Sequence, residues 1–311
     1  MPLFLKPVLK EKLWGGNRLS AYGYTYMGER MGECWCVSAH EHGITVITNG
    51  PYRNQTLDDV WQDAPYLFGD FPTKRFPLLT KIVDTAAPLS IQVHPHDSYA
   101  YEHENGAFGK DECWYILDAV PGAEILLGTD ITNKAQVESL VHARAFDTAF
   151  RKIPVKAGDF FYLPAGTVHS IGEGITVFET QQSSDITYRI YDFERTDQSG
   201  QQRALHLEKA LDVLNTTQAP TICPTVTHVN DHECTHFITT THFSVERWMI
   251  RGTLSYMKPR EFCLVTILDG VGRLIVDGEI YTLKQGHSFV LTAEDLDTIF
   301  EGHLTAMMSY V

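Results

Sequence analysis

Short runs of hydrophobic and β-branched residues, interrupted by Gly, Pro and Asp, recur along most of the 311-residue chain. Runs of this length and composition are typical of β-strands. We expect strands at 76–84, 89–94, 113–119, 124–128, 159–164, 175–180, 187–193, 243–250, 262–270, 272–278 and 287–293. Apolar residues at three- and four-residue spacing predict helices over 56–69, 133–150 and 204–215. The pattern therefore predicts a mainly β protein, a sandwich or small barrel, with a few helices inserted between strands.

An internal repeat indicates that this β structure is present twice. The segment VKAGDFFYLPA at 155–165 resembles LKQGHSFVLTA at 283–293, and ECWYILDA at 112–119 resembles CLVTILDG at 263–270. Two copies in the same order predict two related barrels. Pro, Thr and Asn interrupt both periodicities over 217–235, which favours a linker in that stretch.

The predicted strand at 89–94 carries polar residues on one of its faces. Because alternate residues of a strand share a face, Ser90, Gln92 and His94 project together, opposite three apolar residues. A polar face on a buried strand costs free energy unless partners or a ligand satisfy it. This face is therefore a candidate binding surface.

Two further segments add residues of the kind that bind metals. Lys110 and Glu112 share a face of the next strand, and a Glu is unexpected inside a barrel unless it is paired or bound to a metal. In AGDFFYLPAGTVHS, the spacing that ends at His169 matches the second motif of cupin proteins. Two imidazoles, one carboxylate and one amide oxygen suit a borderline divalent ion. The alternative is an unrelated polar core.

Several segments resemble, in order, the signatures of type I mannose-6-phosphate isomerases of the cupin superfamily. They are WGG, GECWCVS, LSIQVHPHD, GKDECWYILD, LPAGTVHSIG and DITYRIYDFER. The resemblance spans about the whole chain and is to the short bacterial form. It implies two cupin-type (jelly-roll) β-barrels with a few inserted α-helices. It also implies one Zn²⁺ per chain, held by a Gln, two His and a Glu that match Gln92, His94, His169 and Glu112.

The same resemblance implies an aldose–ketose isomerase that interconverts mannose 6-phosphate and fructose 6-phosphate, with Arg189 as the catalytic arginine. The chain departs from the usual cupin pattern, because residues 95–111 separate the first histidine motif from the glutamate and Gln92 replaces a histidine ligand. The extra helical domain of the larger family members is absent from this sequence.

The reaction passes through an enediol, so negative charge develops on O1 and O2 of the sugar. We expect zinc to act there as a Lewis acid and the planar fork of Arg189 to add a second positive charge. Asp185, Thr187, Arg189 and Tyr191 should share one strand face. Asp185 would orient Arg189 or relay a proton, unless the two form an ordinary ion pair.

Lys110 would act on the sugar oxygens or on the phosphate, unless it is a solvated lysine at the barrel mouth. Arginine binds phosphate bidentately, so Arg195, Arg189 and Ser90 are the candidates for holding the phosphate. The general base stays open among a zinc-bound water, Lys110, Asp185 and a histidine such as His96 or His103.

The second copy of the repeat lacks the ligand set. Its alignment with the first copy places Cys263 where Glu112 stands and Asp297 where His169 stands. The His-rich stretch 228–242 is not expected to form another metal site, since ligands must converge in space. We therefore expect a catalytic domain over residues 1–225 and a cupin-like barrel without metal ligands over 226–311.

Composition narrows the partners. The net charge of −14 makes DNA, RNA and anionic lipid poor partners, and no apolar stretch approaches the length of a membrane helix. No signal peptide is indicated, and six scattered cysteines are not a disulfide framework, which favours the cytoplasm. We expect a small phosphorylated sugar as the substrate and a monomer or small homo-oligomer.

The rival functions are another metal-dependent cupin enzyme and a non-catalytic sugar-binding cupin. The enzyme rival would be a sugar-phosphate isomerase of different specificity or an iron dioxygenase, which uses two histidines and a carboxylate. Gln92 and the metal content distinguish the dioxygenase. A binding protein would not need Lys110, Asp185 and Arg189 on the same faces as the ligands.

Overall fold

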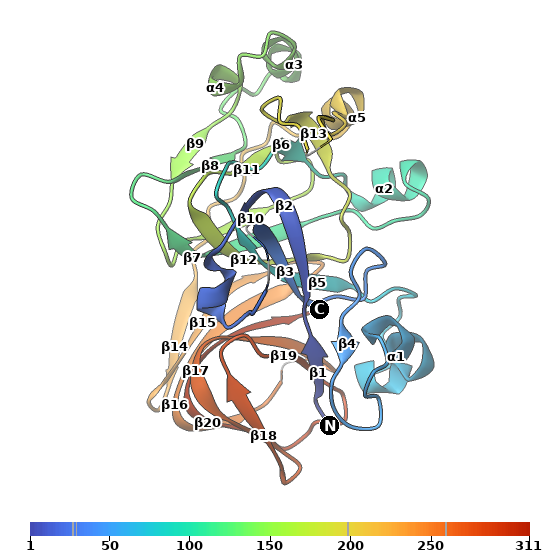
Figure 1. The fold of residues 1–311 in the computed structure, drawn as a ribbon, viewed down its shortest axis with the longest axis vertical. Helices are drawn as coiled ribbons and strands as arrows, with labels where there is room; N and C mark the ends of the chain where they lie inside the picture. Colours follow the sequence, from blue (N-terminus) through green and yellow to red (C-terminus); the bar gives the residue numbers. More distant parts are fainter. Residues whose placement is uncertain (27, 29, 198, 259) are drawn as a thin grey trace.

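The computed structural model describes residues 1–26, 28, 30–197, 199–258 and 260–311. Its strands form three sheets, which are arranged in two parts that lie one above the other in Figure 1. The upper part contains the candidate ligands and most of the helices, and the lower part is built mainly from the C-terminal strands.

The upper part consists of a six-stranded and a five-stranded antiparallel sheet. The six-stranded sheet has the order β10-β7-β12-β5-β3-β2, with β2 Val8–Gly16, β3 Met31–Val37, β5 Leu78–Asp84, β7 Glu112–Ala119, β10 Phe160–Leu163 and β12 Ile175–Gln182. The five-stranded sheet has the order β13-β6-β11-β8-β9, with β6 Ile91–Val93, β8 Glu124–Leu127, β9 Lys152–Pro154, β11 His169–Ile171 and β13 Tyr188–Tyr191.

The lower part is a nine-stranded sheet of order β14-β15-β16-β20-β17-β19-β1-β4, with β18 paired to β17. Its strands are β1 Leu3–Lys6, β4 Val46–Ile47, β14 Thr225–Val229, β15 His232–Thr239, β16 Ser244–Tyr256, β17 Cys263–Val276, β18 Glu279–Lys284, β19 Ser288–Leu291 and β20 Thr298–Tyr310. The mainly β, cupin-type fold expected from the sequence is confirmed, although the sheets keep free edges and do not close into complete barrels.

The helices are short and lie in the connections between strands. They are α1 Leu57–Asp63, α2 Asp97–His103, α3 Lys134–His142, α4 Phe146–Ala149 and α5 Leu207–Val213, with 3₁₀ helices η1 Arg18–Tyr22 and η2 Pro65–Phe68. Each predicted helical range contains at least one of them. The pattern over 56–69 is divided at Pro65, which cannot continue α1, and that over 133–150 is divided at Arg144, where φ is 56°.

The internal repeat is visible in the pairing of the strands. In the upper part Leu163 of β10 lies opposite Glu112 of β7, and in the lower part Leu291 of β19 lies opposite Cys263 of β17. The register therefore places Cys263 at the position that Glu112 occupies in the first copy. Asp297, the counterpart of His169, is exposed and precedes β20.

The three long strands of the lower sheet bend together at a row of glycines. Gly252 of β16 lies opposite Gly302 of β20, which lies opposite Gly272 of β17. A Cβ at Gly302 would stand 2.5 Å from the carbonyl oxygen of Val271, so no larger residue fits without movement. Because the backbone continues through this bend, the predicted strands 262–270 and 272–278 form the single strand β17.

The predicted linker is only partly correct. Residues 214–224 carry no helix or strand, but β14 and β15 occupy 225–229 and 232–239. The division at 225/226 stays a prediction. The structure adds that β1 pairs with β19 and with β4, so N-terminal residues lie in the lower sheet (Figure 1).

The repeat makes a testable prediction about the lower sheet. Cys263 is fully buried and its sulfur lies 3.9 Å from the hydroxyl of Tyr256. We expect Cys263→Ser to leave the metal content of the purified protein unchanged, because no ligand set surrounds this position among the residues that the structure describes. Elemental analysis of both proteins is the measurement. A stoichiometric loss of metal from the variant would mean that the lower sheet binds it.

Candidate metal centre and active site

Three predicted ligands converge between the two sheets of the upper part. His94 directly follows β6, Glu112 begins β7 and His169 begins β11. The Nε2 atoms of His94 and His169 are 3.1 Å apart, and Glu112 carboxylate oxygens lie 3.5 Å from the first and 3.3 Å from the second. All three side chains are buried, so the group is shielded from bulk water.

Hydrogen bonds to backbone carbonyls set the tautomer of both imidazoles. Nδ1 of His94 lies 2.7 Å from the carbonyl oxygen of Ile186, and Nδ1 of His169 lies 2.9 Å from that of Thr167. A carbonyl only accepts, so each Nδ1 carries the hydrogen and each Nε2 presents a lone pair. Two lone pairs 3.1 Å apart repel unless a cation or a donor lies between them. Backbone bonds of this kind are typical of metal-binding histidines.

Electrostatics keep both histidines in the form that binds a metal. Burial and the charge of Lys110 lower the pKa of His169 to about 3 and that of His94 well below its usual value. Both rings are therefore neutral near pH 7. Oε1 of Glu112 is buried without a hydrogen-bond partner among the described residues. A buried acceptor left unsatisfied costs about 1–3 kcal/mol, which a cation in this position would offset.

Gln92 adjoins the three converging side chains. Its amide Nε2 lies 3.2 Å from Nε2 of His169, and its Oε1 accepts a hydrogen bond from the Ser90 hydroxyl at 3.0 Å. A half-turn of the amide would direct Oε1 at the ligand group, and the Ser90 hydroxyl can accept from the amide as well as donate. In that orientation Gln92 would supply a fourth, oxygen ligand.

Lys110 is buried against the ligand group. Its Nζ lies 2.5 Å from Oε2 of Glu112 and donates to Nε2 of His94 at 3.0 Å. Glu179 of β12 lies 3.7 Å from the same Nζ and 2.9 Å from Nζ of Lys81. Burial raises the pKa of Glu179. Glu112, Lys110, Glu179 and Lys81 thus form a row of alternating charges that begins in the ligand group.

A cavity of about 150 Å³ opens beside this group. Its walls include predicted site residues from separate segments: Ser90, Gln92, Lys110, Asp185 and Arg189. The structure therefore brings together on one cavity five of the residues that the sequence predicts for substrate binding and catalysis.

Arg189 stands beside the ligands but is not one of them. In the pairing of β13 with β6 it lies opposite Gln92. Its Nε is buried with no hydrogen-bond partner among the described residues, and burial lowers its pKa. A half-buried guanidinium without a bound carboxylate is suited to an anionic ligand.

Asp185 is paired differently from the prediction. Its carboxylate lies 2.5 Å from Nδ1 of His42 and 3.4 Å from Nε2 of His40, rather than on Arg189. Burial would raise the pKa of Asp185, but the hydrogen bond from His42 and the nearby His40 hold it below its usual value. Asp185 is thus a fixed anion at the wall of the cavity.

Three sequence predictions are corrected by the positions of the side chains. Tyr191 does not share the cavity face, because a register shift follows Arg189 and turns its ring onto Phe146, 4.6 Å away. His96 and His103 are at the ends of α2, where His96 caps the helix and His103 is exposed. Neither histidine lines the cavity, so both lose their place among the candidate bases.

Arg195 is also not brought to the cavity wall. Its Nη1 donates to the carbonyl oxygen of Pro88 and its Nη2 to Asp192, both at 2.5 Å. Sequence reasoning missed Arg203, which does line the cavity, and Glu179, whose place in the apolar run ITVFET was the available signal.

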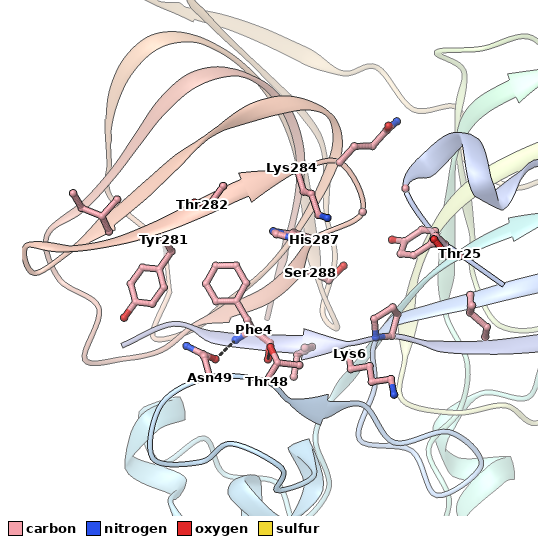
Figure 2. Close-up of a pocket in the computed structure, with 18 residues that line it drawn as sticks. Phe4, Lys6, Thr25, Thr48, Asn49, Tyr281, Thr282, Lys284, His287 and Ser288 are labelled. Atoms are coloured by element: carbon pink, nitrogen blue, oxygen red, sulfur yellow. Dashed lines mark hydrogen bonds between the residues drawn. The ribbon is translucent and has the colours of Figure 1, made fainter.

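A larger cavity of about 700 Å³ lies in the lower part, between β1 and the strands β18 and β19. Figure 2 shows the ring of Phe4 beside that of Tyr281, with Lys6 and Lys284 on other sides of the hollow. The residues lining it include one histidine, His287, and no carboxylate, so it lacks a ligand set for a metal.

The cupin-type fold, with two histidines and a carboxylate converging beside a polar cavity, is typical of metal-dependent cupin enzymes. The comparisons with known proteins narrow this class. A family model described as phosphomannose isomerase type I, catalytic domain, matches residues 3–117. A second, described as mannose-6-phosphate isomerase, cupin domain, matches residues 233–311.

Relatives match over the full length. Mannose-6-phosphate isomerase ManA of Bacillus subtilis (strain 168) is 43% identical over 312 residues, covering 100% of this chain and 99% of that protein. The mannose-6-phosphate isomerase of Streptococcus mutans is 43% identical over 310 residues, covering 99% and 98%. The solved structure of the mannose 6-phosphate isomerase from Bacillus subtilis matches with a TM-score of 0.97 at 38% identity, covering 100% and 99%.

A mutant phosphomannose isomerase from Salmonella typhimurium matches with a TM-score of 0.81 at 15% identity, covering 99% of both chains, and shows the shared fold alone. The chain belongs to the type I mannose-6-phosphate isomerase family. The family expected from the sequence motifs, and the expectation of an enzyme, are confirmed.

Proposed function

We propose that the protein is a zinc-dependent isomerase that interconverts mannose 6-phosphate and fructose 6-phosphate through an enediol. One observation carries the proposal: the neutral imidazoles of His94 and His169 and the carboxylate of Glu112 converge directly behind Gln92 and Lys110, which line the same cavity as Arg189. The two full-length relatives named above are mannose-6-phosphate isomerases, which supports the same substrate here.

The proposed metal ligands are His94, His169, Glu112 and the amide oxygen of Gln92. A bound Zn²⁺ would supply a Lewis acid toward the oxygens of C1 and C2. These side chains are themselves held in place and would fix its position, since both imidazoles are held by backbone carbonyls and Glu112 is held by Lys110.

Lys110 is the residue we assign to proton transfer beside C1 and C2. Its ammonium group contacts two ligands, and its chain lines the cavity. Glu179 limits the movement of Lys110, because its carboxylate lies between the ammonium groups of Lys110 and Lys81. Asp185, fixed by His42, is the second group in reach of a sugar hydroxyl from the cavity wall.

Arg189 is the residue we assign to the oxygens on which charge develops. Its position opposite Gln92 places it next to the ligand set, and its guanidinium is free to donate in a fixed plane. Donors arranged in advance in a partly dry cavity stabilise developing charge more than water does, because they need no reorganisation during the reaction.

We further propose a cytoplasmic enzyme that works as a monomer or small homo-oligomer on a small phosphorylated sugar. All six cysteines are free thiols in the structure, five of them buried, as expected in a reducing compartment. Among the described residues no helix has the length and apolar character that crossing a membrane requires.

The proposed function is tested by one assay made before and after metal removal. The purified protein should convert mannose 6-phosphate to fructose 6-phosphate, contain about one zinc per chain, lose activity on chelation and regain it with Zn²⁺. Elemental analysis also distinguishes zinc from iron. A fully chelated protein that keeps its turnover would overturn the metal-dependent proposal.

A further inference from the structure

The end of the cavity beyond Arg189 carries an excess of positive charge. The carboxylate of Asp192, one residue past β13, accepts hydrogen bonds from Nε and Nη2 of Arg203 at 2.7 and 2.5 Å. It also accepts one from Nη2 of Arg195 at 2.5 Å. One buried carboxylate thus serves two guanidinium groups, and Arg189 adds a third positive charge nearby. In a chain with a net charge of −14, such a local excess is unusual.

Most of the lysines that line the cavity are less available to an anion than Arg203, because a carboxylate already holds them. Lys12 lies 3.3 Å from Glu33, Lys81 lies 2.9 Å from Glu179 and Lys110 lies 2.5 Å from Glu112. Lys10 donates to the carbonyl oxygen of His42 and sits 3.3 Å from the centre of the Trp35 ring. Neither contact of Lys10 is with a carboxylate, so Lys10 is the alternative to Arg203 as the residue that binds an anion.

Arg203 differs from Arg195 in keeping one guanidinium nitrogen, Nη1, available to donate hydrogen bonds to a ligand. The contacts with Asp192 use Nε and Nη2 of Arg203 and hold the group in one plane, while Nη1 keeps its two hydrogens. Nη1 of Arg195 donates a hydrogen bond to the carbonyl oxygen of Pro88, and Arg195 does not line the cavity. The His206 N–H donates to the carbonyl oxygen of Arg189, and the Arg189 N–H donates to Nδ1 of His206, which holds the segment of Arg203 against β13.

The strand ladder orders these groups along one line. Tyr188 of β13 lies opposite Val93, next to the ligand His94, and Arg189 lies opposite Gln92. Asp192 follows at the other end, about 10 Å along the strand from Arg189 at the usual rise per residue. A hexose bound with C1 and C2 at the proposed metal ligands and with its carbon chain along β13 would bring its sixth carbon toward that end.

We propose that Arg203, anchored by Asp192, binds the phosphate group of the substrate and thereby selects phosphorylated over free sugar. The inference rests on the proposed function, with the reacting carbons at His94, Glu112 and His169. Arg203 is a binding residue in this scheme: it holds the dianion equally in the ground state and in the transition state, while Arg189 stands between it and the metal centre.

The test compares Arg203→Gln with the wild-type holoenzyme. We expect the KM for mannose 6-phosphate and the inhibition constant of inorganic phosphate to rise roughly 10- to 100-fold, the range for a lost hydrogen bond to a charged group. The kcat should stay within about threefold, because uniform binding is removed. Arg203→Lys should recover part of the affinity, since it keeps the charge without the fork.

Matched variants decide between the cations. Arg144→Gln removes an exposed arginine paired with Glu194 and serves as the surface control. An unchanged KM in Arg203→Gln, with a large rise in Arg195→Gln or Lys10→Gln, would overturn the assignment. Circular dichroism and zinc content of each variant separate a lost contact from a lost fold.

Calorimetric titration of the holoenzyme with inorganic phosphate separates this inference from the proposed function. It requires no turnover, so it gives an answer even for a protein that does not isomerise mannose 6-phosphate. Weaker phosphate binding by Arg203→Gln supports the subsite in either case. Equal binding by the wild type and the variant refutes it.

Discussion

His169→Ala is expected to abolish both metal binding and isomerase activity while leaving the fold intact. The side chain is buried, and its Nε2 is one of two lone pairs that face each other across 3.1 Å. Removing one of few protein ligands opens the site to water and removes a fixed donor. The measurements are elemental analysis and the mannose 6-phosphate assay, with circular dichroism to verify the fold.

His142→Ala is a suitable control for this substitution, because His142 ends α3 and lies outside the cavity wall. It should keep full metal content and activity. A metal-free His169→Ala protein with wild-type turnover would contradict the assignment of the metal centre. Retention of the metal with loss of turnover would instead limit His169 to a role in the reaction.

Arg189→Ala is expected to keep the metal and the fold but to lose turnover. A single donor aimed at developing charge is typically worth roughly 10²–10³ in rate. Arg189→Lys should recover only part of this, since an ammonium lacks the planar fork. Steady-state kinetics at matched zinc content measure both variants.

The split between kinetic constants locates the role of Arg189. A fall in kcat places the guanidinium at the reacting carbons, as proposed. A rise in KM alone would place it with Arg203 in the phosphate subsite, because it would then act equally in the ground and transition states. An unchanged kcat/KM would remove Arg189 from the reaction.

Parts of the candidate metal centre could be predicted from the sequence because strand periodicity determines which side chains share a face. Ser90 and Gln92 are hydrogen-bonded to each other, and Lys110 contacts Glu112, as alternation along their segments requires. Periodicity does not predict that the pair Ser90 and Gln92 lies next to the pair Lys110 and Glu112. Their contact depends on how the two sheets pack, and only the family resemblance brought the four ligands together.

The residues that sequence reasoning missed have positions set by tertiary contacts. Arg203 lies in a loop without periodicity, and its place is decided by the bonds between His206 and Arg189. The long strand β20 contains Glu301, Gly302 and His303, which interrupt its apolar pattern, yet pairing with two neighbours orders it. The helix α2 has Ala100 as its one buried residue, so its sequence shows no apolar helical period.

The place of β1 in the lower sheet has a consequence for how the molecule is assembled during synthesis. Residues 3–6 leave the ribosome long before their partner in β19. β1 can pair with β4 early, but its other edge stays open until β19 is made, and closing this contact late adds a slow, non-local step to folding. Cutting the chain at residues 214–224 would not yield two complete units, since the C-terminal fragment would lack the strand that covers the edge of β19.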